Sequence, residues 1–164
     1  MEGKPCAWVD VRGSQERVGT SWMCKTEAKR ILELYKGFYQ QAPNLSYGVI
    51  TFYKAQEQAL RREFEKLEDF NTLKSCEKLR VGTIDAFQGK EFDIVILSMV
   101  RSYFNEFLKD PHRLCVAMSR QKKALIMVGD FNFFDKPKTK EQAPGIHAFI
   151  ELRKQEGKIY ENSK

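Results

Sequence analysis

The segment Phe92-Asp-Ile-Val-Ile-Leu-Ser-Met-Val100 is the strongest indication of the fold class of this chain. It is an almost unbroken apolar run, which is typical of a central parallel strand because helices cover both faces of such a strand. Two further apolar runs, over residues 47–52 and 124–129, also predict buried strands. Shorter strands are predicted over residues 6–11 and 79–84. The centre of the chain is therefore expected to be a sheet.

Helices are expected between these strands. Apolar residues recur at helical spacing, with charged residues on the opposite face. Asp110 followed by Pro111 is a typical helix start, because aspartate caps free amides and proline fits the first turn. The predicted helices span residues 25–41, 54–70, 111–120 and 145–155. A polar loop with Gly13 and Gly19 follows the first strand, and a Phe-rich loop spans residues 131–134. This alternation predicts an α/β domain with a mostly parallel sheet and helices on both faces.

Length, composition and charge narrow the function classes. The 164 residues suit one domain, and 42% hydrophobic residues with a mean hydropathy of −0.52 exclude a disordered or membrane-spanning chain. Lysine and arginine number 28 against 22 acidic residues, so the net charge is +6, which suits a polyanionic partner. Residues 1–5 are expected to be a flexible start and residues 156–164 a flexible tail.

The cysteines argue against a metal site and against a disulfide framework. They lie far apart in the sequence without a C-x-x-C pair, and only His112 and His147 are present to complete a zinc site. Dispersed thiols without a signal peptide indicate a reducing, intracellular location. No metal ligand is therefore predicted. The four positions are Cys6, Cys24, Cys76 and Cys115.

Polar residues that follow the strands are the candidate functional residues, because ligands gather at the carboxyl ends of the strands in such sheets. The segment Thr51-Phe-Tyr-Lys-Ala-Gln56 joins a buried strand to a helix. A hydroxyl, the amides of a helix start and Lys54 together suit contact with a phosphate. The alternative interpretation is a helix entry in which Tyr53 packs.

The segment from Thr83 to Asp93 is a tight polar loop between two strands. It combines acidic residues, a glutamine and Gly89, and glycine permits the close backbone approach that a nucleotide or phosphate needs. The alternative is a polar turn in which Gly89 supplies an unusual φ angle and Asp85 caps the turn. Both interpretations stay open for this loop.

The third segment, from Asp110 to Lys123, carries arginines on a predicted helix. Arg113, Ala117 and Arg120 share one face by their spacing, and Arg120 precedes a buried strand, a position from which a guanidinium reaches across a cleft. A guanidinium offers planar, bidentate donors to phosphate oxygens. The alternative is a solvated basic helix end, which the helix dipole favours.

Together and in this order, the three segments resemble motifs IV, V and VI of superfamily 1 helicases, in the branch that includes senataxin and the helicase of nonsense-mediated mRNA decay. The matching stretches are residues 48–56, 81–101 and 107–120 with the strand that follows to Asp130, and Lys25-Thr-Glu-Ala28 resembles a helix start of the family. The resemblance covers residues 13–130. It implies the second, C-terminal RecA-like lobe of an ATP-driven nucleic-acid motor, which is a three-layer α/β domain.

The resemblance implies roles on the nucleotide side. Arg120 matches the arginine finger of motif VI, a catalytic residue that stabilises charge on the γ-phosphate and is worth about 10³–10⁵ in rate where such fingers have been removed. Glu91 matches the glutamate that holds the ribose hydroxyls. Gly89 lets the backbone come close, and Gln88 lies between the nucleotide and strand sites. ATP is the implied cofactor.

On the strand side, the resemblance implies a surface for single-stranded DNA or RNA. The expected strand-binding residues are Thr51, Tyr53, Lys54, Gln56, Thr83 and Asp85. The chain departs from the usual family sequence in three places. It has Thr51-Phe-Tyr53 where the family usually has Thr-Pro-Tyr, and Leu114-Cys-Val116 where the family has Leu-Asn-Val. It has Ser119-Arg-Gln121 where the family has Thr-Arg-Ala. Serine keeps the hydroxyl of motif VI, and Arg120 is retained.

One element of the family is missing from this sequence. The phosphate loop G-x-x-x-x-G-K-[ST] does not occur, because the Gly-Lys pairs that begin at residues 3, 89 and 157 are followed by Pro, Glu and Ile. A RecA-type ATPase needs that lysine and a Mg²⁺-bearing hydroxyl. We therefore expect one RecA-like domain over residues 1–164, excised from a longer helicase. It is expected to be inactive as an ATPase without an N-terminal lobe that carries the Mg²⁺ ligands.

Two other functions stay open. One is a catalytically degenerate lobe that binds nucleic acid or a protein partner; Arg120 and Glu91 argue against it, since such a lobe needs neither. The other is a flavodoxin-like or receiver domain, which needs an acidic cluster or a phosphate loop after the first strand, where Val9-Asp-Val-Arg-Gly13 has a single aspartate. The expected partners are single-stranded nucleic acid and the N-terminal lobe, with no membrane.

Overall fold

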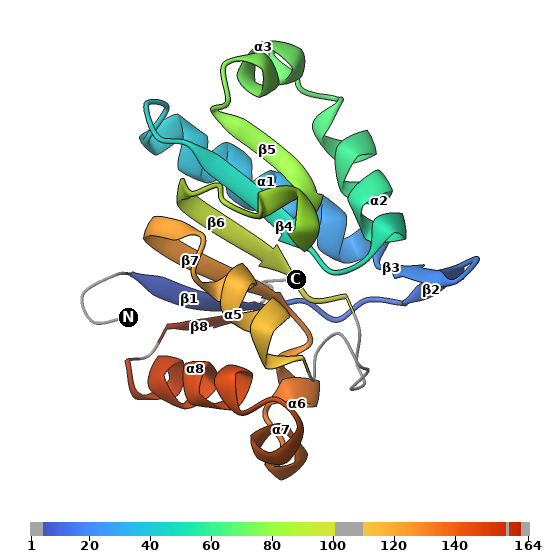
Figure 1. The fold of residues 1–164 in the computed structure, drawn as a ribbon, viewed down its shortest axis with the longest axis vertical. Helices are drawn as coiled ribbons and strands as arrows, with labels where there is room; N and C mark the ends of the chain where they lie inside the picture. Colours follow the sequence, from blue (N-terminus) through green and yellow to red (C-terminus); the bar gives the residue numbers. More distant parts are fainter. Residues whose placement is uncertain (1–4, 101–109, 157, 162–164) are drawn as a thin grey trace.

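A six-stranded sheet forms the centre of the computed structural model, which describes residues 5–100, 110–156 and 158–161 (Figure 1). The strands follow the order β5-β4-β6-β7-β1-β8, and all neighbours in this order are parallel. Their bounds are β1 Cys6–Asp10, β4 Tyr47–Thr51, β5 Leu79–Thr83, β6 Phe92–Ser98, β7 Gln121–Gly129 and β8 Ile159–Glu161. The predicted α/β class with a mostly parallel sheet is confirmed.

Helices cover both faces of this sheet. On one face lie α1 (Lys25–Gln41), α2 (Lys54–Phe64) and α3 (Phe70–Ser75). On the other face lie the 3-10 helix η1 (Ile84–Phe87), α5 (Pro111–Met118), α6 (Phe131–Phe134) and α8 (Pro144–Gln155), with α7 (Pro137–Gln142) packed on α8. Figure 1 shows the two sets of helices on opposite sides of the sheet. These three layers are consistent with a RecA-like domain.

The pleat of the strands sorts the apolar side chains into two cores. Along β6, Val95 and Leu97 belong to the core under α5 and α8, whereas Ile94 and Ile96 belong to the core under α1 and α2. Successive side chains of a strand point to opposite faces, so a run of consecutive apolar residues supplies both cores. The run from Ile94 to Leu97 is apolar on both faces for this reason.

The single helix predicted over residues 54–70 is two helices, α2 and α3. α2 ends at Phe64 and α3 begins at Phe70. Both phenylalanines are buried in the same core, with ring centroids 6.3 Å apart. Residues six apart on one continuous helix point about 120° apart around its axis, so on an unbroken helix the two rings would not lie on the same strip of its surface. The interruption at residues 65–69 lets both rings reach the core.

Regular structure is also found where the sequence predicts loops or a tail. The polar loop after β1 contains the antiparallel pair β2 (Glu16–Val18) and β3 (Ser21–Met23). The Phe-rich loop is α6, whose first turn is capped by the Asp130 side chain. Of the tail predicted over residues 156–164, Ile159–Glu161 form β8 beside β1. Of the predicted flexible start, residues 1–4 lie outside the described residues.

Candidate functional site

The predicted site residues fall into two groups at opposite ends of the sheet. Thr51 and Thr83 are register partners at the carboxyl ends of β4 and β5. Glu91 and Arg120 instead directly precede β6 and β7, at the amino ends of those strands. The expectation that all candidates follow the carboxyl end of a strand is therefore wrong for the second group. β5 and β6 both run parallel to β4, which lies between them. The chain that leaves the carboxyl end of β5 must therefore return, through η1, to the amino end of the sheet before β6 begins.

The carboxyl-end group presents few free side chains. Thr51 and Tyr53 are buried, and the Thr51 hydroxyl accepts a hydrogen bond from the Tyr53 amide at 3.4 Å. Lys54 is exposed in the first turn of α2, and Thr83 is half-buried at the end of β5. This end of the sheet therefore offers a cation and a hydroxyl to a ligand, with Thr51 and Tyr53 packed beneath them.

Gln56 lies entirely inside the chain, at 0% exposure. Its Oε1 accepts from the Cys24 amide at 2.8 Å. Its Nε2 donates to the Cys24 carbonyl at 3.3 Å and to Ser98 Oγ at 3.1 Å. Gln56 thus joins the start of α2 to the residue before α1 and to the end of β6. Gln56 therefore has a structural role beneath the predicted strand-binding residues.

Glu27 completes the same network, although the sequence patterns did not predict it. It is 1% exposed in the first turn of α1, and it accepts from Ser98 Oγ at 2.5 Å and from the Val100 amide at 3.1 Å. Burial raises the pKa of this carboxyl from 4.5 to about 7, against the lowering effect of the hydrogen bonds from Ser98 and Val100. Helical spacing is the sequence feature that could have predicted this residue. Glu27 lies on the same inward face of α1 as Ile31, and an ionisable residue is unusual on such a face.

Asp85 and Arg113 link η1 to the first turn of α5. Arg113 Nη2 lies 3.4 Å from the Asp85 carboxylate, which is exposed. The same turn of α5 is capped by Asp110, whose side chain accepts from the amides of His112 and Arg113. This cap confirms the predicted start of the helix. An exposed pair of this kind adds little stability, but it places the predicted strand-binding Asp85 beside a cation.

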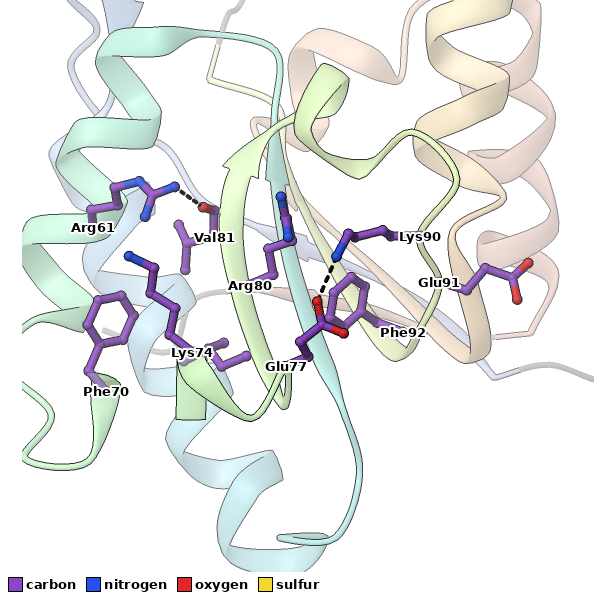
Figure 2. Close-up of a pocket in the computed structure, with 10 residues that line it drawn as sticks. Arg61, Phe70, Lys74, Glu77, Arg80, Val81, Lys90, Glu91 and Phe92 are labelled. Atoms are coloured by element: carbon purple, nitrogen blue, oxygen red, sulfur yellow. Dashed lines mark hydrogen bonds and ion pairs between the residues drawn. The ribbon is translucent and has the colours of Figure 1, made fainter. Parts of the chain in front are cut away.

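The loop from Gln88 to Glu91 is open to solvent. Gln88, Gly89 and Glu91 are all exposed. Gly89 has a φ of +72°, which favours glycine, and no atom lies within 4 Å of the place that a Cβ would take. Figure 2 shows the Glu91 side chain directed away from β5. The backbone of this loop is therefore accessible to a ligand, with the Glu91 carboxylate beside it.

Arg120 lies next to this loop. Its carbonyl accepts from the Phe92 amide at 2.9 Å, which joins the residue after Glu91 to the residue before β7. Its half-buried guanidinium donates from Nε to the Val116 carbonyl at 3.1 Å and from Nη2 to Ser119 Oγ at 3.0 Å. Both acceptors are neutral groups at the C-terminal end of α5. No carboxylate among the described residues pairs with this charge, so it stays available to an anion.

A carboxylate, an open backbone loop and a guanidinium therefore share the amino ends of β6 and β7. Carboxylate oxygens accept hydrogen bonds from the hydroxyls of a sugar, and a guanidinium binds phosphate oxygens with two parallel donors. This combination is suited to a nucleotide. It lies apart from the cation and hydroxyl at the carboxyl ends of β4 and β5, so the domain has two candidate surfaces.

The described part of the chain contains no metal centre: no three histidine, cysteine or acidic side chains in it are grouped to hold an ion. None of the four cysteines, all of which lie in the described ranges, forms a disulfide; Cys6 and Cys24 are buried, and Cys76 and Cys115 are exposed. Over the same residues, none of the helices combines the length and the apolar character that crossing a bilayer requires.

Known proteins resemble this chain over most of its length. Residues 1–132 match the family described as AAA domain. The chain is 35% identical over 116 residues to the regulator of nonsense transcripts 1 homolog of Neurospora crassa, a match that covers 68% of this chain and 10% of that protein. It is 34% identical over 136 residues to an uncharacterized ATP-dependent helicase of Methanocaldococcus jannaschii, covering 82% of this chain and 19% of that protein.

A third relative is the DNA replication ATP-dependent helicase/nuclease dna2 of Schizosaccharomyces pombe, 32% identical over 128 residues, which covers 75% of this chain and 8% of that protein. The chain thus spans between 8% and 19% of the length of these three relatives. The family match, the parallel three-layer fold and the order of the three motifs agree. The chain belongs to the AAA domain family and is a C-terminal RecA-like lobe of the superfamily 1 helicases, in the branch that includes senataxin and the nonsense-mediated-decay helicase.

Proposed function

We propose that this chain is the second motor lobe of an ATP-dependent nucleic-acid helicase or translocase, with Arg120 as its arginine finger. The observation that carries the proposal is the hydrogen bond of 2.9 Å between the Phe92 amide and the Arg120 carbonyl, which holds motifs V and VI side by side. Glu91 and Arg120 thereby reach the same end of the domain from two different motifs. ATP is expected between this end and another lobe.

The nucleotide surface fits one part of an ATP molecule. Glu91 would hold the ribose hydroxyls through its exposed carboxylate, while the open space at Gly89 lets the backbone approach. Arg120 would exchange its bonds to Val116 and Ser119 for bonds to phosphate oxygens. ATP, when bound, supplies the phosphoryl bond whose hydrolysis drives a motor. A guanidinium aimed at the charge that develops there is worth about 10³–10⁵ in rate.

The other part of the ATP site is proposed to belong to an N-terminal lobe of the same protein. The sequence has no phosphate loop, and the described residues hold no cluster for a metal ion. The phosphates and Mg²⁺ therefore need ligands from elsewhere. We propose that the chain alone does not hydrolyse ATP. Closure of the two lobes on ATP, and their reopening after hydrolysis, would move them along a strand.

Single-stranded nucleic acid is proposed to cross the carboxyl ends of β4 and β5. Lys54 and Thr83 present a cation and a hydroxyl there, and Asp85 stands at the start of η1. The net charge of +6 favours a phosphate backbone, which proteins contact without strong sequence preference. One relative is named for transcripts and another for DNA replication, so both RNA and DNA belong in the test.

The test is strand-stimulated ATP hydrolysis by the longer protein that joins this chain to a lobe with a phosphate loop. Arg120→Ala is expected to lower kcat by about 10³-fold or more, because the guanidinium acts on the reacting phosphate. Strand binding is expected to stay the same. Arg62→Ala removes an exposed arginine of α2 and is the matched control, with full activity expected.

Each outcome decides between functions. An unchanged kcat after Arg120→Ala would show that this residue is not the finger. Turnover of ATP by the 164-residue chain alone would show that a second lobe is not required. A longer protein that binds strands but never hydrolyses ATP would support the alternative, a catalytically degenerate lobe that serves as a binding module.

A further inference from the structure

A groove of about 330 Å³ runs along the outer edge of β5, between α3 and the loop that precedes β6 (Figure 2). β5 is the terminal strand at this end of the described sheet, so its outer edge is open. Figure 2 shows cationic side chains on both sides of β5. They are Arg61 and Lys74 on one side and Arg80 and Lys90 on the other. The groove is therefore a cationic channel over an open sheet edge.

The two acids of the groove do not cancel its charge. Glu77 is paired with Lys90 at 2.7 Å, and the Lys90 ammonium lowers the pKa of Glu77, so the Glu77 carboxyl stays ionised at neutral pH. Glu91 points away from β5 (Figure 2). Within the described ranges, neither Lys74 nor Arg80 has a carboxylate at ion-pair distance. The groove thus keeps a net positive charge, with Lys74 on one side of β5 and Arg80 on the other. The Arg80 charge also acts on Glu77, and its guanidinium lies 5.8 Å from the centre of the Phe87 ring.

Arg61 occupies part of the open edge and so hinders pairing with a strand of another protein. Its Nη2 donates to the Val81 carbonyl at 2.6 Å, in the middle of β5, and its Nε and Nη2 hold the Glu57 carboxylate at 3.0 and 2.9 Å. A strand that added to β5 would need that carbonyl for its own ladder. Strand addition is therefore opposed, whereas a ligand that contacts the cations from outside is not.

The described residues that line the groove also offer no surface on which a base can stack. The two aromatic side chains among them, Phe70 and Phe92, are 6% and 4% exposed and belong to the cores. Exposed aromatic faces are the main surfaces on which bases stack. Free cations without a stacking surface suit a phosphate backbone better than a nucleotide that is recognised by its base.

We propose that this groove binds the phosphodiester backbone of a single-stranded nucleic acid, as a second contact surface in addition to the carboxyl ends of β4 and β5. The inference rests on the proposed nucleic-acid function of the chain. Lys90 belongs to the same loop as Gly89 and Glu91. A strand in the groove would therefore touch the loop that carries the nucleotide-side residues.

The test is binding of a labelled single-stranded oligonucleotide, as DNA and as RNA, followed by fluorescence anisotropy over a series of salt concentrations. Lys74→Gln combined with Arg80→Gln is expected to weaken binding. The slope of log K against log salt is expected to fall by about 1.4, because each phosphate contact on a single strand contributes about 0.7. Lys138→Gln with Lys140→Gln removes the same charge from exposed positions of α7 and is expected to change neither quantity.

Two further variants separate charge from folding. Lys74→Arg with Arg80→Lys keeps both charges and is expected to bind as the wild type does. Circular dichroism checks the fold; if the double glutamine variant loses helix signal, Lys74→Gln alone is used, with an expected slope change of about 0.7. Lys74 is exposed, so this single change leaves the cores intact.

The inference is overturned if the double variant Lys74→Gln with Arg80→Gln leaves the salt slope unchanged. It is also overturned if the α7 double variant lowers the slope by the same amount. If the groove double variant binds as the wild type does while Lys54→Gln weakens binding, the strand contacts the carboxyl ends of β4 and β5 and does not contact the groove. If the wild-type chain binds no strand at all, the proposed strand contact fails together with the groove.

Discussion

Replacing Glu27 by glutamine tests the buried network that joins α1 to the end of β6. Glu27 is 1% exposed, and its oxygens accept hydrogen bonds from Ser98 Oγ and from the Val100 amide. No cation among the described residues pairs with it. Glutamine has nearly the same shape and keeps an acceptor for the Val100 amide, but it cannot ionise. Glu27→Gln therefore isolates the effect of charging this carboxyl.

The magnitude follows from the pKa. Burial raises the pKa of Glu27 from 4.5 to about 7 in the folded chain. Between these two pH values the folded state binds more protons than the unfolded state, so the free energy of unfolding falls as pH rises. The stabilisation is fully present below pH 4.5 and is lost as pH passes 7. The difference between the two pKa values corresponds to about 3 kcal/mol.

The assay is urea unfolding of the wild type and of Glu27→Gln at a series of pH values from 4.5 to above 7. With an m-value of roughly 2 kcal/mol/M, about 3 kcal/mol moves the midpoint by about 1.5 M. The wild type is expected to lose this amount relative to Glu27→Gln as pH rises. Glu33→Gln, an exposed acid on the same helix, is the control and is expected to follow the wild-type profile. Parallel profiles for the wild type and Glu27→Gln would refute the argument that burial raises this pKa.

Three other substitutions test the packing around the site by the same unfolding assay. Gln56→Ala is expected to lower stability by about 3 kcal/mol, because it leaves buried hydrogen-bonding partners unsatisfied; a loss below about 1 kcal/mol would mean that water replaces the amide. Gly48→Ala would place a methyl group 2.9 Å from the Phe87 ring, and a loss of about 1–3 kcal/mol is expected from overpacking; no loss would show that the ring moves freely. Asp110→Ala is expected to cost about 1 kcal/mol through loss of the helix cap, and an unchanged midpoint would contradict that role.

Sequence patterns predicted the elements whose structure depends on neighbours along the chain. The helix over residues 25–41 was predicted with the bounds it has, because its apolar spacing is regular over four turns and more. The start of α5 followed from Asp110 and Pro111 for a similarly local reason. Periodicity failed at residues 65–69. There α2 ends and α3 begins, and Phe64 and Phe70 pack in the same core, an arrangement that the local apolar pattern does not show.

The candidate site was predicted in part. The motifs singled out Glu91 and Arg120, and the structure brings their segments together through the Phe92 amide. The same motifs also singled out Gln56, whose polar atoms are taken up inside the chain. A motif records which residue type stands at a position, but it does not record whether that side chain faces the ligand or the interior. Burial depends on which elements pack against it.

Patterns over short stretches of sequence were enough to predict the α/β class, the succession of strands and helices, and the likeness to a helicase lobe. Packing between distant segments divides the candidates between the two ends of the sheet, buries Glu27, and places Lys74 and Arg80 on either side of an open edge. Glu27 and Ser98 stand 71 residues apart. An apolar pattern shows that a strand is buried, but the order of strands comes from packing between distant segments.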